Sequence, residues 1–254
     1  MSRINGIPLK EDKELTSRVE ELAYRALQYQ LPQFTDFLDM RQLDVSKGVL
    51  KQFGLIELTS FGGFADAERA VLCISEYNVP YDEFPICCVK AEYNSPKALS
   101  HRDFLGALMS LGIKRSKIGD ISVCEGGAYI AVSQIVSKAV VSQLESVGSC
   151  SVRCEICRDF PSSITADMSP IRASVSSLRL DSVVAVSLKV SRQKAQSLVA
   201  RIGVKLNCRD VFSPDARVCE NDVFSVKGYG KFKLSEVVGQ SKKGKTIIII
   251  NKYN

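Results

Sequence analysis

The sequence predicts an α+β protein built from three small domains. Its 254 residues are 45% hydrophobic, and a single core rarely grows beyond about 250 residues, so more than one core is expected. The apolar pattern also changes twice along the chain, from helical spacing to short alternating strands and helices, and then to two helical stripes followed by strands. Charge divides the chain as well. Residues 1–175 carry 19 Lys and Arg against 22 Asp and Glu, whereas residues 176–254 carry 15 against 6, a net charge of +9.

The first domain, residues 1–80, is expected to be mainly helical. Apolar residues recur at spacings of three and four from Leu15 to Leu27, and Pro32 ends that run. A second helix is expected over residues 43–53. A short strand over residues 55–58 should then lead through Gly62-Gly63 to a third helix that begins near Ala65.

The middle domain, residues 81–160, has the pattern of a ferredoxin-like fold. Its expected elements are a strand over 86–91, a helix over 100–111 capped by Ser100, strands over 118–124 and 128–132, a helix over 134–144 and a strand over 151–156. The helix over 134–144 should bury one face, which includes Ile135. The order β-α-β-β-α-β occurs in many RNA-recognition modules. The stacking aromatics of an RNA-recognition motif are missing, because the central strands offer only Tyr129, so an RNA role for this domain is a weak inference.

A linker over residues 161–177, rich in Ser, Thr and Pro, is expected to precede a basic domain over residues 178–254. One apolar stripe runs from Leu180 to Leu188, and a second runs from Ala195 to Ile202, with Ser191 as the N-cap and Gly203 at the C-terminus of the second helix. Alternating strands should follow over 204–207, 222–227 and 231–234. The basic residues expected on the exposed faces are Arg179, Lys189, Arg192, Lys194, Arg201, Lys205, Lys227, Lys231 and Lys233.

These nine side chains make the basic domain the candidate RNA-binding site. A rigid helix pair and a strand edge, each with Arg or Lys, can match the phosphates of a folded RNA. Any single lysine is better explained as a solvated residue, but the cluster favours a polyanion as the partner. Arg192 and Lys194 lie in the first turn of the second helix, where backbone N–H groups favour a phosphate. Arg192 is the foremost candidate, and its exposed position predicts that Arg192→Glu leaves the fold intact.

The motifs of this domain resemble the S-four domain, the alpha-L motif of a small-subunit ribosomal protein. The resemblance is carried, in order and spacing, by Arg179-Leu180-Asp181, Ser191-Arg192-Gln193-Lys194-Ala195, Ile202-Gly203-Val204-Lys205-Leu206-Asn207 and Asn221-Asp222-Val223-Phe224-Ser225-Val226. Similar domains occur in pseudouridine synthases and tyrosyl-tRNA synthetases. Cys208 departs from the pattern, because glycine usually follows the asparagine.

Upstream motifs resemble the bacterial YlmH-like family, so the resemblance covers nearly the whole chain. They are Phe37-Leu38-Asp39, the stretch from Gly62 to Arg69 and the stretch from Leu111 to Ile121. The resemblance implies a non-enzymatic, ribosome-associated factor. It would act on large subunits that carry stalled peptidyl-tRNA, in the quality control of nascent chains, and would have a link to cell division. The implied partners are ribosomal RNA of the large subunit, tRNA and the ribosome.

Catalytic, metal and cofactor sites are not expected. Cys154 and Cys157 have the spacing of metal ligands, but on a strand they point to opposite faces, and no second pair completes four ligands. His101 is the only histidine and should lie at a helix N-terminus. An RNA-modifying enzyme of the pseudouridine synthase type stays an alternative, although residues 1–175 lack the pattern of its catalytic domain. A cell-division scaffold is a further alternative, which leaves the charge unexplained.

The expected location is the cytoplasm, and the chain is expected to act as a monomer without a membrane partner. No apolar run approaches the ~18 residues that span a bilayer, and residues 1–14 are too polar for a secretion signal. Nine irregularly spaced cysteines are typical of reduced, mostly buried thiols.

Overall fold

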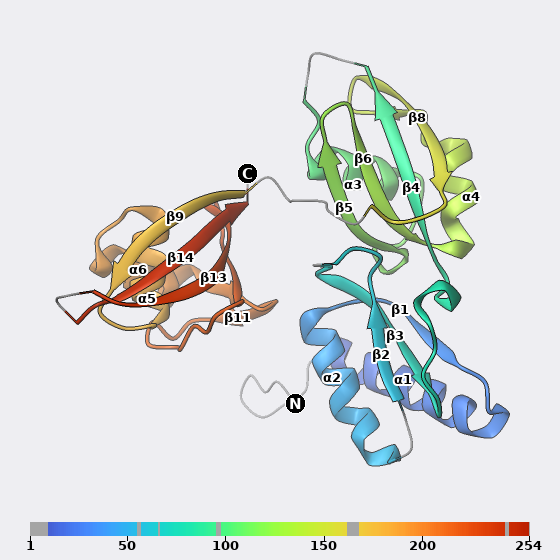
Figure 1. Cartoon of the computed structure of the whole chain (residues 1–254), viewed down its shortest axis with the longest axis horizontal. Coiled ribbons are helices and arrows are strands. Elements are labelled where there is room, and N and C mark those ends of the chain that lie inside the picture. The colour runs from blue at the N-terminus through green and yellow to red at the C-terminus, as the bar shows by residue number, and fades with distance from the viewer. Residues whose placement is uncertain are drawn as a thin grey trace. The chain divides into compact units, whose positions relative to one another are not determined.

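The computed structural model divides the chain into two compact units, residues 1–164 and residues 165–254 (Figure 1). The structure describes residues 10–54, 57–65, 67–94, 98–161, 168–241 and 244–253. Both units combine α-helices with antiparallel sheets, so the α+β class is confirmed. The expected boundary at residue 80 does not separate two compact bodies, because the first two expected domains form one unit.

The N-terminal part of unit 1 adds to its helices a three-stranded antiparallel sheet that the sequence did not predict. In chain order it has α1 (Lys10–Tyr29), β1 (Gln33–Asp39), α2 (Met40–Leu50), the 3-10 helix η1 (Lys51–Phe53), β2 (Glu57–Phe61) and β3 (Arg69–Ser75). The strand order is β1-β3-β2. Among the described residues around position 65 no helix begins. The strand expected over 55–58 overlaps β2, and residues 55 and 56 lie outside the described part.

The central strand β3 is buried on both faces, which explains why its apolar run carries no alternation. Leu72 and Ile74 pack with residues of α1 and α2 in one core. Val71 and Cys73 point to the other face and pack with Ala131 of the middle part of the chain. The sheet therefore lies between its own two helices and the ferredoxin-like part (Figure 1).

The ferredoxin-like arrangement expected for the middle part is confirmed. Its elements are η2 (Tyr81–Glu83), β4 (Ile86–Tyr93), α3 (His101–Ser110), η3 (Arg115–Lys117), β5 (Ile118–Cys124), β6 (Gly127–Ser133), α4 (Gln134–Gln143), the short β7 (Ser146–Val147) and β8 (Cys150–Cys157). The sheet has the order β5-β6-β4-β8-β7. Ser100 caps α3 in a capping box with Asp103. Ile135 is not in the core, since it is 80% exposed in the first turn of α4.

The upstream motifs meet where the two sheets of unit 1 join. Arg69 donates from Nε to the Ile118 carbonyl (3.1 Å) and from Nη2 to the Phe37 carbonyl (2.8 Å). The backbone N–H of Glu68 donates to Asp120 Oδ2 (2.6 Å). Gly119 lies so close to its neighbours that a Cβ there would stand 2.5 Å from Cε1 of Phe37. These motifs therefore hold the two parts of unit 1 together.

Unit 2 is a six-stranded antiparallel sheet with two helices (Figure 1). Its elements are β9 (Met168–Val175), α5 (Leu180–Leu188), α6 (Arg192–Ile202), β10 (Val204–Leu206), β11 (Arg209–Val211), β12 (Val223–Val226), β13 (Gly230–Gln240) and β14 (Thr246–Tyr253). The strand order is β11-β10-β12-β13-β14-β9.

The prediction of a linker over residues 161–177 is wrong for the second half of that range. Residues 168–175 form β9, which pairs with β14 along its whole length, from Met168 opposite Tyr253 to Val175 opposite Thr246. The pattern of this stretch concealed a strand because Ser169, Pro170 and Ser174 dilute its apolar residues. Pro170 is tolerated because β9 is an edge strand.

Both helices of unit 2 pack on one face of the sheet. Leu180, Val183 and Val184 of α5 and Ala195 and Val199 of α6 are fully buried. They form one core with the inward side chains of the sheet, namely Val204, Phe224, Val226, Phe232, Leu234, Ile248 and Ile250. The expected helix ends are confirmed, because Ser191 Oγ accepts from the Lys194 N–H (3.2 Å) and Gly203 is the C-cap residue of α6. This core fixes which faces of unit 2 remain outward.

Candidate nucleic-acid interface

A buried carboxylate organises two of the predicted basic residues. Asp181, in the first turn of α5, is fully buried. Its Oδ1 accepts from Arg179 Nε (3.3 Å), and its Oδ2 accepts from Arg192 Nε (3.1 Å) and Gln196 Nε2 (2.9 Å). Residues from the N-terminus of α5 and from α6 thus converge on one anion. The two arginine side chains keep 41% and 49% of their surface exposed, so their guanidinium groups still face solvent.

The surroundings of Asp181 keep it ionised. Burial opposes the charged form, but hydrogen bonds from Gln196, Arg192 and Arg179 outweigh it and hold the pKa of Asp181 at about 2, below its ordinary value of 3.8. A buried ion needs such partners, because an unpaired one is strongly destabilising. The aspartate therefore holds both arginines through Nε and leaves N–H groups of each planar guanidinium for a second acceptor.

This ion pair corrects the expectation for Arg192→Glu. Arg192 is on the exposed face of α6 as predicted, but its Nε is bound to a buried carboxylate. A glutamate at this position would place a second negative charge beside Asp181. We therefore expect this substitution to destabilise the helix pair, and it is unsuitable as a test of RNA binding alone.

The other predicted helix residues surround the same helix pair. Lys189 is the exposed C-cap of α5, in a left-handed conformation with φ of 53°. Lys194 is exposed in the first turn of α6. Arg201 is exposed in its last turn, where a cation is favourable to the helix dipole. The structure thus brings Arg179, Lys189, Arg192, Lys194 and Arg201 onto the two helices.

The strand lysines belong to a different face of unit 2. Lys205, Lys231 and Lys233 alternate with side chains that point into the core against the helices. They therefore lie on the opposite side of the sheet. Lys231 Nζ stands 4.8 Å from the centre of the Tyr253 ring. Lys227 follows β12 in the exposed turn before β13. The nine predicted residues consequently form a helix group and a sheet group rather than one continuous surface.

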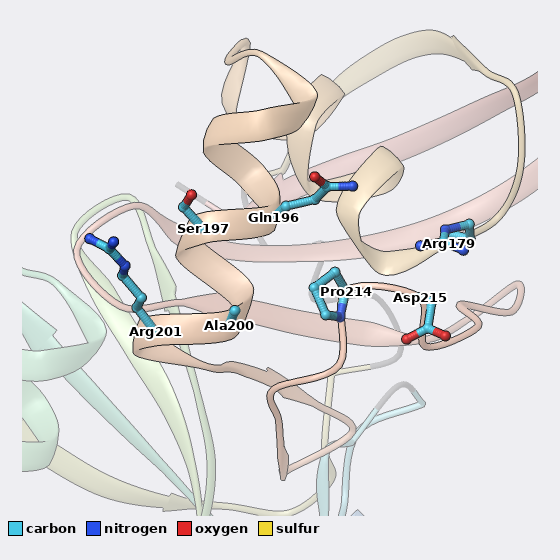
Figure 2. A pocket seen from close by; sticks show the side chains of 7 residues that line it. All are labelled: Arg179, Gln196, Ser197, Ala200, Arg201, Pro214 and Asp215. Atoms are coloured by element: carbon cyan, nitrogen blue, oxygen red, sulfur yellow. The ribbon is translucent and has the colours of Figure 1, made fainter.

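An open pocket of about 390 Å³ lies beside α6 (Figure 2). Its lining is Arg179, Gln196, Ser197, Ala200, Arg201, Pro214 and Asp215. The two arginines lie at opposite ends of the view, with Ala200 and Pro214 between them (Figure 2). Sequence patterns identified the arginines but not the pocket, because residues 214 and 215 come from a loop whose position depends on tertiary contacts.

The structure also assigns roles to residues that the sequence did not single out. Asp181 was part of a motif, but an acidic residue in a first helical turn is usually solvated. Asn207 donates to Asp222 Oδ1 (2.7 Å) and accepts from the Val223 N–H (2.9 Å). These bonds attach the turn between β10 and β11, in which Asn207 and Cys208 both have positive φ, to the start of β12. The φ of 62° at Cys208 explains why glycine is the usual residue there.

The face of the middle sheet that its helices leave uncovered carries basic and acidic side chains side by side. Ala131 and Cys88, at one end of that face, are buried, and Ala131 packs against the N-terminal sheet. On the remaining part Tyr129 lies opposite Lys90, and Lys90 lies opposite Glu155. Lys90 also forms an ion pair with Glu92. The positive and negative charges on this face of the sheet therefore offset one another, so the face attracts a polyanion only weakly.

The cysteines do not assemble a metal site among the described residues, where no three His, Cys, Asp or Glu side chains gather. All nine are outside disulfides. Cys154 packs against the helix-side core, whereas Cys157 is opposite Cys88 on the other face of the sheet. Burial, with a smaller contribution from Cys157, raises the pKa of Cys88 to about 12. Cys124, Cys208 and Cys219 are exposed, so the prediction of buried thiols is correct for only part of the nine cysteines.

Among the described residues no helix has the length and apolar character needed to cross a membrane. The described part of the chain therefore gives no evidence of a helical membrane span.

Comparisons with known proteins identify the family. The family model described as "Putative RNA-binding domain in YlmH" matches residues 80–159, the ferredoxin-like part. The chain is 36% identical over 222 residues to ribosome-associated protein quality control protein P2 of Bacillus subtilis (strain 168), and the match covers 86% of each protein. The solved structure of cell division protein ylmH from Streptococcus pneumoniae matches with a TM-score of 0.52 at 21% identity, over 61% of this chain and 96% of that one, which concerns the fold alone. Because the identity extends over most of both chains, the protein belongs to the YlmH family.

Proposed function

We propose that the chain is a non-enzymatic RNA-binding factor of the large ribosomal subunit. It would contact ribosomal RNA and peptidyl-tRNA in the cytoplasm during quality control of stalled nascent chains, and it would act as a monomer without a cofactor. The similarity to a ribosome-associated quality control protein and the match to a family described as RNA-binding support this proposal. The further details rest on the chemistry of unit 2, which we take to be an S-four-type domain.

The observation that carries the proposal is the concentration of positive charge on a folded helix pair. Residues 176–254 have a net charge of +9, whereas the rest of the chain has −3. Asp181 holds Arg179 and Arg192 in fixed positions. Fixed cations can match the phosphate spacing of a folded RNA, and each phosphate contact releases bound counterions. RNA with compact tertiary structure is therefore a better partner than a flexible strand.

The division into two groups makes the helix group the primary surface. Its five basic residues surround α5 and α6, and they include both arginines that Asp181 orients. The sheet group would contact a second element of the same RNA or a neighbouring tRNA. The match of a described RNA-binding family to residues 80–159 favours a further contact by the middle part. Its mixed charges predict that this contribution is weaker.

An RNA-modifying enzyme is the competing function. Such an enzyme needs an acid, base or nucleophile in a pocket beside the RNA. The pocket beside α6 offers Asp215, whose carboxylate accepts from Ser213 and whose pKa is lowered by that bond. An ionised surface carboxylate without a second titrating group is poorly suited to general acid catalysis, so we favour binding.

Co-sedimentation with purified large ribosomal subunits tests the proposal. The double variant Lys189→Glu/Lys194→Glu changes two exposed side chains and leaves in place the backbone bonds of both residues, from the Lys189 N–H to the Ala185 carbonyl and from the Lys194 N–H to Ser191 Oγ, so its fold should persist. We expect association at about 50 mM salt to weaken by more than tenfold, because two repelling charges replace two attracting ones. Wild-type association should fall by orders of magnitude when salt is raised to about 200 mM.

Lys13→Glu is the matched control, since Lys13 is an exposed lysine of α1 in the acidic part of the chain. It should sediment like the wild type. A loss in Lys13→Glu half as large, on a logarithmic scale, as that in the double variant would mean that net charge, rather than the helix group, determines association, because the double variant changes twice as much charge. Circular dichroism of each variant verifies the fold.

A further inference from the structure

We infer that the pocket beside α6 receives one unpaired nucleotide of the bound RNA, with guanine as the preferred base. This inference rests on the proposed RNA-binding function and names the RNA feature that unit 2 would recognise. The pocket, about 390 Å³, is within the range of about 300–1,000 Å³ typical of small-ligand sites.

The walls of the pocket are held in place before any ligand arrives. The Asp181 N–H donates to the Pro214 carbonyl (2.9 Å), and the Leu180 N–H donates to the Ala216 carbonyl (2.8 Å). These bonds fasten the loop that contains Pro214 and Asp215 to the N-terminus of α5. The same loop also packs closely against the end of α6. The Phe212 ring lies so near Gly203 that a Cβ on Gly203 would stand only 2.8 Å from Cε1 of Phe212. A preformed site loses little entropy when it binds.

The charges of the pocket fit the two phosphates that flank a nucleotide. Arg179 and Arg201 lie at its opposite ends (Figure 2). Asp181 fixes the guanidinium of Arg179 through Nε, and Arg201 extends from the last turn of α6. A nucleotide within an RNA chain has a phosphate on each side. A pocket with a cation at each end therefore suits such a nucleotide better than it suits a free base, which has no phosphate.

The middle of the pocket fits a flat base. Ala200 and Pro214 lie between the arginines and present small apolar surfaces (Figure 2). Ser197 and Gln196 add polar atoms along α6. A base in a duplex is stacked and paired, so only an unpaired base could enter.

Asp215 gives the base preference. Asp215 is one of the residues that line the pocket, and the hydrogen bond from Ser213 lowers the pKa of its exposed carboxyl group. An ionised carboxylate accepts hydrogen bonds and donates none. The Watson–Crick edge of guanine presents two adjacent N–H donors, whereas adenine and cytosine present one donor beside an acceptor, and uracil presents one donor between two acceptors. Guanine therefore matches Asp215 best.

The test uses the intact chain and 5′-GMP, AMP, CMP and UMP as probes, with saturation-transfer NMR as the readout of binding. We expect GMP to bind most tightly. Ala200→Leu fills the pocket without changing charge and with only a small change in helix propensity, and it should weaken GMP binding at least tenfold, in the range that loss of one stacked base produces. Gln193→Leu is the matched control, because Gln193 is an exposed residue of α6 outside the pocket. It should bind GMP like the wild type.

Asp215→Asn separates base recognition from simple electrostatics. We expect the preference for GMP over AMP to disappear, while overall binding persists. An equal gain in affinity for all four nucleotides would mean that Asp215 acts only through its charge, and the guanine preference would be overturned.

Co-sedimentation of the same variants with large subunits distinguishes this inference from the proposed function. If the wild type fails to sediment with subunits, the proposed function is wrong. If the wild type sediments, but GMP does not bind or Ala200→Leu binds it equally well, only the nucleotide pocket is overturned. Agreement of both readouts, with Ala200→Leu weakened about tenfold on subunits as well, supports the pocket.

Discussion

At the scale of single residues, the chemistry of unit 2 centres on Asp181. It is fully buried, yet it is ionised because two arginines and a glutamine donate to it. The arrangement links stability to function, since the same side chains that neutralise the buried charge are candidates for binding phosphate. A phosphate would share each guanidinium with Asp181 rather than replace it, because each arginine has five N–H donors.

The lowered pKa of Asp181 predicts an acid-sensitive unit 2. A carboxyl group whose pKa is lowered on folding stabilises the folded state above its unfolded pKa and loses that contribution as the pH falls through the folded pKa. Asp181 should therefore contribute fully above about pH 4 and lose about 2 kcal/mol as the pH falls from its ordinary pKa of 3.8 to about 2.

Calorimetric melting of the intact chain between pH 2 and pH 5 measures this contribution. Asp181→Asn should lower the melting temperature of unit 2 at pH 5 and flatten its dependence on pH. Asp210→Asn, which changes an exposed aspartate of β11, should retain the wild-type slope. A wild-type slope in Asp181→Asn would show that other carboxyl groups cause the acid sensitivity.

At the scale of elements, the junction between the two sheets of unit 1 depends on close approach of backbones. Gly119 of β5 leaves no room for a side chain, since a Cβ there would stand 2.5 Å from Cε1 of Phe37 and 2.9 Å from Cβ of Ala131. We expect Gly119→Ala to lower the free energy of unfolding of unit 1 by about 1–3 kcal/mol, the range for overpacked cores. Urea denaturation followed by circular dichroism measures the loss.

Gly106→Ala is the control for that substitution. Gly106 lies on the exposed face of α3, and a Cβ there would meet no atom within 4 Å. Alanine is a better helix former than glycine, so this change should stabilise unit 1 by up to about 1 kcal/mol. A stabilising effect of both substitutions would contradict the tight junction.

The elements that the sequence predicted well have local signals. Ser191 and Gly203 mark the ends of α6 because capping depends on neighbouring backbone atoms. The strand β3 was missed because an apolar run without alternation fits a buried strand or a buried helix equally. The strand β9 was missed because its evidence is its partner β14, more than 70 residues away. The role of Asp181 was missed for the same reason, since it depends on α6 as well as on its own helix.

At the scale of the whole molecule, the two units differ in net charge and in the features that suggest a function. Unit 2 carries the net positive charge and the candidate interface, whereas unit 1 carries the described RNA-binding family match and a closely packed pair of sheets. The expected boundary at residue 178 would cut unit 2, because β9 precedes it.

A fragment experiment tests this boundary. Residues 165–254 should unfold cooperatively, whereas residues 178–254 lack β9 and expose the apolar edge of β14. We expect the shorter fragment to have a lower melting temperature and to aggregate more readily, measured by circular dichroism and light scattering. Equal melting temperatures for the two fragments would mean that β9 contributes nothing to the stability of the unit.

The pairing of β9 with β14 also places the first and last described residues of unit 2 side by side, since Met168 is opposite Tyr253. A body whose first and last residues are neighbours can be joined to another chain at one point, or spliced into a surface loop, without rearranging the host. Gene fusion could therefore move such a body between proteins as a single cassette. The same geometry would let unit 2 be attached to a different protein without a change in the fold of either partner.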